Sequence, residues 1–137
     1  MTKVYRVDIL EEKLKQLATA VPGIQGTVIV SLEGFVVATY PPADGQGTGL
    51  LHPTSTPQVA AMAATLIALG EQTLTRLAQG EMERLMIEGE QGAMIVYPVN
   101  QNAALAVMVS KEAKIGLTLM AVARSAAFFA DVLSGAE

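Results

Sequence analysis

The fold is decided by residues 24–40, which read IQGTVIVSLEGFVVATY. The central residues 28–30 are apolar on both faces, as in a strand that lies between two helical layers. Glu33-Gly34 signals a turn, and the β-branched and aromatic residues 35–40 after it favour a second strand. The stretch therefore predicts a β-hairpin within a sheet that is covered on both sides.

A helix is predicted before this hairpin. Asp8 can cap its start, and Glu11 three residues later completes a capping box. Pro22 and Gly23 are expected to end it. The apolar residues between these signals share one helical face that can pack on the sheet: Leu10, Leu14, Leu17, Ala18 and Val21.

The second predicted helix has almost no polar side. Thr56 and Pro57 mark its start as an N-cap and a first-turn proline, and the helix is expected to run to about Gln79 and stop at Gly80. Residues 59–70 read VAAMAATLIALG, which is far short of the roughly 20 apolar residues that span a bilayer. A helix that is apolar all round must be covered all round. One side can pack on the sheet, so the other is expected to need a partner.

Three more strands follow the second helix. Residues 82–88 and 93–99 are predicted strands around a turn at residues 89–92. After a tight turn at residues 100–102, the continuous apolar run 103–109 predicts a buried strand. Strands joined by tight turns form antiparallel sheets, so we expect five antiparallel strands.

The chain ends with a third predicted helix, which Ser110 can cap and Ser134-Gly135 can end. The complete order is α-β-β-α-β-β-β-α, and it predicts an α/β (α+β) fold with helical layers on an antiparallel sheet. The apolar face of this last helix repeats at steps of four and three: Ile115, Leu119, Val122, Ala126, Phe129 and Leu133.

The composition favours one domain that meets another subunit. A chain of 137 residues fits a single domain. Hydrophobic residues make up 51% and charged residues 16%, which leaves less polar surface than a monomer of this size normally displays. The net charge is -4 and no Lys/Arg cluster occurs, which argues against a nucleic-acid partner.

The location expected from the sequence is the cytoplasm. The chain has no cysteine, which excludes disulfides and thiolate metal sites and fits a reducing compartment. Residues 1–16 are amphipathic and charged, without the apolar run of a secretory signal. Residues 115–133 are long enough to span a membrane but contain Arg124 and Asp131, so we interpret them as a buried helix and expect no membrane insertion.

Short motifs recur in a fixed order along the chain. Pro22-Gly23 and Gly26 precede the first strand, Glu33-Gly34 forms the first turn, residues 88–92 form a short hairpin turn, and residues 113–116 (AKIG) lead into the last helix. Over nearly the whole chain, this order and spacing resemble the Roadblock/dynein light-chain family, including stand-alone bacterial and archaeal members such as gliding-motility GTPase regulators. None of the motifs is catalytic.

The resemblance implies a profilin-like layering, with the first and last helices on one face of the sheet and the middle helix on the other. It also implies homodimers that pair through the middle helix and the third strand. Proteins of this family commonly act as platforms or activity modulators for small Ras-like GTPases in motility, trafficking, signalling or polarity complexes. The expected function is therefore a non-enzymatic homodimeric adaptor that binds a small Ras-like GTPase as a scaffold or activity modulator.

Two stripes of the middle helix are candidates for the dimer contact. We assign the stripe of Ala60, Ala64, Ile67 and Leu74 to the partner subunit, because small alanines permit close approach of helices. The neighbouring stripe consists of Val59, Met62, Leu66, Leu69 and Thr73. The third strand adds an exposed edge. The predicted interface thus comprises Ala60, Ala64, Ile67, Leu74, Arg84, Leu85, Met86 and Ile87. The alternative is that both stripes are internal core under the loop at residues 41–56.

No cofactor, metal or catalytic set is predicted. His52, in the proline- and glycine-rich loop 41–56, has no neighbouring ligand or catalytic residue in the sequence. The glycines of that loop lack the pattern of a phosphate-binding loop, and the glutamates at residues 81–90 are expected to be solvated. No arginine is marked by the sequence as an inserted arginine finger, and Arg76 and Arg84 stay open as candidates for that role. The alternatives to an adaptor are a ligand-sensing domain, a purely structural dimerisation domain and, least favoured, an enzyme.

Overall fold

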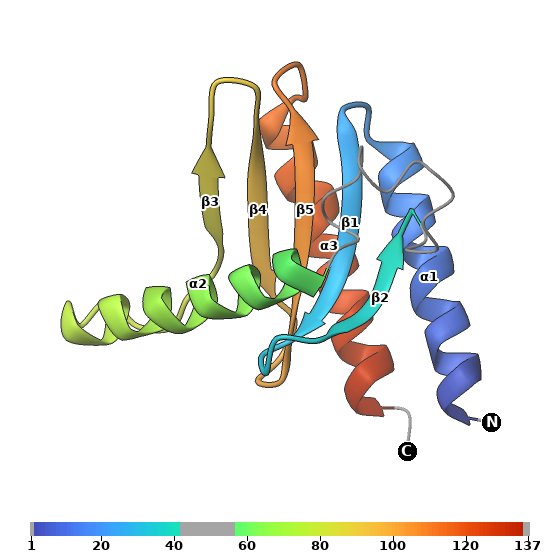
Figure 1. Cartoon of the computed structure of the whole chain (residues 1–137), viewed down its shortest axis with the longest axis horizontal. Helices are drawn as coiled ribbons and strands as arrows, with labels where there is room; N and C mark the ends of the chain where they lie inside the picture. The colour runs from blue at the N-terminus through green and yellow to red at the C-terminus, as the bar shows by residue number, and fades with distance from the viewer. Residues whose placement is uncertain (1, 42–56, 136–137) are drawn as a thin grey trace.

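The computed structural model describes residues 2–41 and 57–135. Within these residues, helices and strands follow the predicted order (Figure 1), which confirms the α/β fold class. The loop at residues 42–56, with His52 and the predicted cap Thr56, lies outside them. The elements are α1 Thr2–Ala20, β1 Ile24–Ser31, β2 Val36–Tyr40, α2 Pro57–Arg76, β3 Leu85–Glu88, β4 Gly92–Pro98, β5 Ala103–Ser110 and α3 Ile115–Gly135.

The strands form one five-stranded antiparallel sheet in the order β2-β1-β5-β4-β3. The predicted hairpin of β1 and β2 is closed by a bond from the Ser31 N–H to the Phe35 carbonyl oxygen (2.8 Å). Gly34 in this turn has a φ of 102°, a backbone conformation that favours glycine. The sheet has β2 at one edge and β3 at the other, so the third strand is the edge strand that the sequence led us to expect.

Two apolar layers cover the two faces of the sheet. On one face, α1 and α3 contribute Leu10, Leu14 and Phe129 to a core with Ile29 and Leu105. On the other face, α2 packs on smaller side chains that include Val28, Ala104 and Ala106. This confirms the layering that the family resemblance implied.

Two predicted helix starts are wrong. α1 covers Thr2–Ala20, so Asp8 lies inside the helix; residues 2–7 contain no proline or glycine that would interrupt it. Ser110 is the last residue of β5, and its carbonyl oxygen accepts a turn bond from the Ala113 N–H (3.1 Å). α3 begins only at Ile115, after that turn.

α2 ends earlier than the glycine at position 80 suggested. Its last residue is Arg76, and Ala78 takes a left-handed conformation with a φ of 56°. The Gln79 N–H donates to the Leu74 carbonyl oxygen (2.9 Å), and the Ala78 N–H donates to the Thr75 carbonyl oxygen (3.1 Å). These bonds form a Schellman motif with an alanine where glycine is usual.

β3 is shorter than predicted, because only Leu85–Glu88 pair with β4. The Val99 N–H donates to the Ala103 carbonyl oxygen in β5 (2.9 Å). Backbone groups of successive residues in an antiparallel strand point to opposite neighbours, so those of the preceding residue, Pro98, point toward β3. Proline has no N–H to donate there, and its partner position in this register would be Glu83. Pairing therefore stops before residues 82–84.

α3 is buried on one side only, so the interpretation of residues 115–133 as a buried helix is partly wrong. Val122 and Phe129 are buried in the core with the sheet and α1, and Ala126 is buried as well. Leu117 and Met120 lie on the opposite side and are exposed. The reason is geometric: the sheet and α1 cover one side of α3, and no other described element packs on it.

Candidate interaction surface

α2 crosses one face of the sheet and then projects beyond its edge. Figure 1 shows the helix lying across the strands, with its C-terminal end past β3. Its buried residues all lie near the N-terminal end, within Val59–Ile67, whereas nearly every residue from 71 to 80 is exposed. Half of the helix therefore has no sheet beneath it in the described chain.

The predicted partner stripe of α2 is largely wrong. Ala60, Ala64 and Ile67 are buried within the single chain, and Ile67 is only 1% exposed. Small side chains let α2 approach its own sheet closely, where Ala104 and Ala106 are small as well. These positions belong to the core and are not available to a second subunit. Leu74, farther along the stripe, is half-buried.

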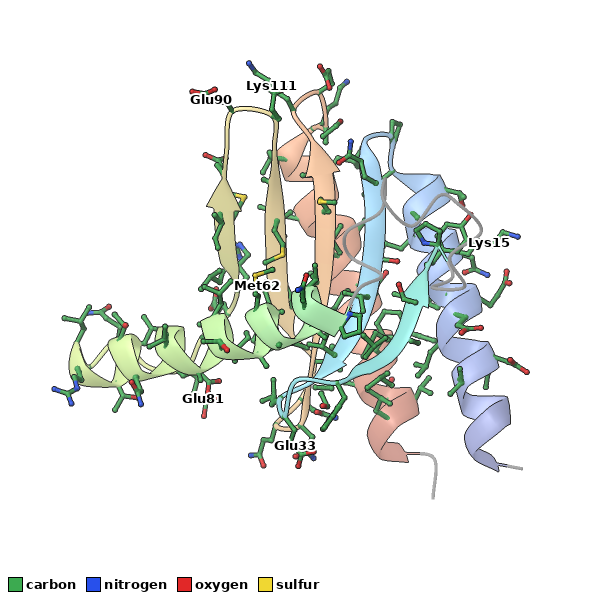
Figure 2. All side chains as sticks on the ribbon, in the orientation of Figure 1. Lys15, Glu33, Met62, Glu81, Glu90 and Lys111 are labelled. Carbon is green, nitrogen blue, oxygen red and sulfur yellow. The ribbon has the colours of Figure 1, made fainter. Side chains whose placement is uncertain are left out.

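The neighbouring stripe is the exposed one. Met62 is 54% exposed and Leu69 is 56% exposed, while Leu66 between them is half-buried. Met62 lies on the flank of α2 that faces along the sheet toward the β3–β4 turn, the turn marked by Glu90 (Figure 2). We call Met62, Leu66, Leu69 and Thr73 the α2 flank; large exposed apolar side chains that adjoin one another typically mark an interaction site.

β3 presents a free edge next to this flank. The Gly89 N–H donates to the Gly92 carbonyl oxygen (2.7 Å), and ladder bonds alternate along a strand. Leu85 and Ile87 therefore turn their backbone groups toward β4, whereas Met86 and Glu88 turn theirs toward the edge, beyond which no described strand lies. The Met86 and Ile87 side chains are exposed and Leu85 is half-buried. Arg84, just before the strand, is exposed as well.

An apolar hollow lies on the α2 side of the sheet, at the end of β3 that α2 does not cover. Its volume is about 450 Å³, and Ile87, Met94 and Met108 line its floor. The paired positions Ile87↔Met94 and Met94↔Met108 place these side chains in a row across β3, β4 and β5. Methionine adapts its shape to the group that covers it, which suits such a floor to a contact surface.

At the opposite end of β3, the chain packs under α2. The place that a Cβ atom would take at Gly70 is occupied by the Met82 side chain, with Leu85 close by. The absence of a side chain at Gly70 thus allows α2 to cross the beginning of β3. A second hollow of about 650 Å³ lies beside this crossing, lined by residues that include Glu71, Glu81 and Gln101.

Polar chemistry is sparse in the described part of the chain. The glutamates at positions 81, 83, 88 and 90 are exposed, as the sequence led us to expect. No group of three or more His, Cys, Asp or Glu side chains that could hold a metal ion occurs among the described residues. The features that stand out on this side of the sheet are the α2 flank, the edge of β3 and the methionine hollow.

The family profile of the Roadblock/LC7 domain matches residues 10–109, from the middle of α1 to the end of β5. The chain belongs to the Roadblock/LC7 domain family. This confirms the family that the motif order suggested.

Known relatives of this Roadblock chain span most of its length. Two uncharacterised proteins of Methanocaldococcus jannaschii are each 27% identical to it over 104 residues, which cover 76% of this chain and 82% of the relative. A Roadblock/LC7 domain from Streptomyces avermitilis has a TM-score of 0.78 at 22% identity and covers 90% of this chain and 96% of its own. The gliding protein MglB of Thermus thermophilus has a TM-score of 0.75 at 15% identity, covering 93% and 90%.

Sequence reasoning missed part of the surface that this Roadblock chain exposes. The α2 flank is visible in the sequence as a stripe, but the sequence does not show that this stripe is the exposed one and that Ala60, Ala64 and Ile67 are buried. The hollow around Met94 and Met108 could not be found from periodicity, because strand methionines are most often core residues. It exists because α2 crosses only one end of the sheet (Figure 1).

Proposed function

We propose that this Roadblock chain is a non-enzymatic homodimeric adaptor that binds a small Ras-like GTPase in the cytoplasm. The observation that carries the proposal is the apolar surface made by the α2 flank and the free edge of β3. An uncovered strand edge beside exposed Leu and Met side chains is a liability that pairing with a second copy removes. Dimerisation is the first step of the proposal, and binding of the GTPase is the second.

Two copies would pair through antiparallel β3 strands. Such pairing places a two-fold axis perpendicular to the sheet at the edge of β3, so that the same patch on each copy meets itself. The outward N–H and C=O groups of Met86 and Glu88 would then form ladder bonds with the partner strand. The two five-stranded sheets would become continuous.

The same two-fold axis gives the projecting half of α2 a place to bind. In each copy, α2 crosses the end of β3 near Leu85, and the hollow lies at the end near Ile87 and Gly89. A rotation by 180° exchanges the two ends of β3. The projecting half of each α2 would therefore lie over the methionine hollow of the other copy.

Apolar side chains are available on both sides of this contact. Leu69 is on the α2 flank, and Leu77, just after the helix, is also exposed. They would cover Met94 and Met108 of the second copy, with Leu66 at the margin. Removal of such side chains from water is the main favourable term in stable association.

The GTPase would dock on the outer side of the paired α2 helices. The side of α2 that points away from the sheet carries Ala61, Thr65, Ala68 and Gln72, all of them exposed, small or uncharged. Two such helices side by side make a broad platform without a deep cleft. The GTPase as the class of partner rests on the family resemblance, and modulation of hydrolysis would act by positioning the switch residues of the GTPase itself.

The test is binding to the small Ras-like GTPases of the same organism, each loaded with GDP or with a non-hydrolysable GTP analogue. We expect binding that differs between the two nucleotide states. Thr65→Arg should remove the binding without changing the mass of the dimer, because Thr65 lies on the outer side of α2. If no GTPase binds in either state, the adaptor function is wrong even if the homodimer is real.

A further inference from the structure

A second exposed apolar stripe lies on the other face of the molecule, along the outer side of α3. Its large side chains are 60% exposed at Met120, 47% at Leu117 and 37% at Phe128. The stretch Ile115–Leu133 has a mean hydropathy of 1.5, yet only 28% of it is buried. This stripe, which we call the α3 stripe, comprises Leu117, Met120, Arg124, Ala127, Phe128 and Asp131.

Most of the α3 stripe faces away from the described elements that pack on the helix. Phe128, at the margin of the stripe, lies next to α1, because the Lys13 Nζ atom is 5.0 Å from the centre of its ring. The buried residues Val122 and Phe129 belong to the core with the sheet and α1 on the opposite side of the helix. At 100° per residue, Arg124 and Asp131 fall in the middle of the exposed side. The stripe is therefore separate from the α2 flank and β3, which lie across the sheet.

The charges of the α3 stripe are self-complementary. Arg124 and Asp131 are its only charged residues, they are opposite in sign, and they lie about 10 Å apart along the helix axis. In the described part of the chain, neither forms an ion pair with another side chain. When two such helices run antiparallel about an axis between Ala127 and Phe128, each Arg124 lies beside Asp131 of the other copy, and Ala127 near the crossing leaves room for close approach.

We infer that a second copy of this chain covers the α3 stripe through an antiparallel, two-fold pairing of two α3 helices. A parallel arrangement would place like charges together, and an anionic membrane surface would repel a chain whose net charge is -4. This interface does not depend on the proposed α2 and β3 dimer. If both exist, assemblies larger than two chains form, because each copy uses two different surfaces.

Charge reversal tests the pairing with an internal rescue. The two-fold pairing contains two contacts between positions 124 and 131, and either Arg124→Asp or Asp131→Arg puts like charges in both. We therefore expect either variant to raise the dissociation constant of the α3 contact about tenfold or more. The double variant Arg124→Asp/Asp131→Arg restores both pairs and should return the wild-type mass. Lys111→Glu is the matched control, because Lys111 lies in the turn before α3, at the end of the sheet (Figure 2).

The measurement is solution mass by light scattering across a dilution series, and the wild-type mass should fall with each single reversal and return in the double variant. If the mass is the same in both single reversals and in the double variant as in the wild type, the α3 pairing is wrong. If the mass falls only with Leu69→Glu, the α3 pairing is wrong and the proposed α2 and β3 dimer is supported. A mass that falls with Arg124→Asp but not with Leu69→Glu supports the α3 pairing and contradicts the α2 and β3 dimer. Flotation with zwitterionic vesicles that requires Met120, without any change in mass, would overturn the second-copy assignment.

Discussion

Ile67 and Leu69 lie two positions apart on α2 and are both large and apolar, yet their environments are opposite. Ile67 is buried on its own sheet, whereas Leu69 is more than half exposed. Both belong to a helix that is apolar on almost every side, so hydrophobicity alone does not distinguish them. The comparison teaches that the rotation of α2 about its axis decides which stripe is core and which stripe is free to meet a partner.

The largest expected effect is the loss of stability on changing Ile67, the buried residue of the pair. Ile67→Glu buries a charge without a partner and should destabilise the fold by about 4 kcal/mol or more, a large part of the stability of a small domain. Urea unfolding followed by circular dichroism measures the change. Leu69→Glu, at the same protein concentration, is the matched control and should retain the folded spectrum; equal loss of structure in the two variants would contradict the assigned rotation of α2.

The next effect separates the two sides of β3. Met86→Pro removes an N–H that faces the free edge, so the hairpin should survive while the homodimer weakens by about 2 kcal/mol, from one lost bond in each copy. The dissociation constant can be measured by sedimentation. Ile87→Pro removes an N–H that faces β4 and should destabilise the fold itself. If Met86→Pro left the dimer unchanged, β3 would not be the shared strand.

The smallest effect concerns the projecting end of α2. Ala78→Gly relieves the left-handed conformation of an alanine and should raise the free energy of unfolding by about 0.5 to 1 kcal/mol. The same change at Ala68, inside the helix, should lower that free energy by about as much. Thermal melts of the two variants provide the comparison, and a loss of stability at Ala78 would mean that the helix does not end in this motif.

The sequence was sufficient for the sheet and its layers because strand and helix signals depend on local period. The apolar centre at residues 28–30, the turn at Glu33-Gly34 and the short hairpin at residues 88–92 all predicted what the structure contains. Helix ends were harder. Asp8 and Ser110 have the chemistry of N-caps, but whether a residue caps a helix depends on the conformation of the residues before and after it.

The candidate surface was only partly predictable. The edge position of β3 followed from the order of elements that the family resemblance implied. The stripe of α2 that faces the core depends on the fit between Ala60, Ala64 and the small side chains of β5, which is a tertiary property. The exposed side of α3 could not be predicted from the sequence, because its apolar residues have the composition of a buried helix.

The most direct test compares the solution masses of two proteins, Arg124→Asp and Arg124→Asp/Leu69→Glu. Both carry Arg124→Asp, because that change removes the proposed α3 contact. We predict that the Arg124→Asp protein with Leu69 intact has the mass of two chains. Adding Leu69→Glu should give a folded single chain, because the dissociation constant of the dimer rises by about a hundredfold. Each copy would contribute one buried charge to the interface. A single-chain mass before Leu69 is changed, or a two-chain mass that survives the change, would contradict the claim that the α2 flank and β3 meet a second copy.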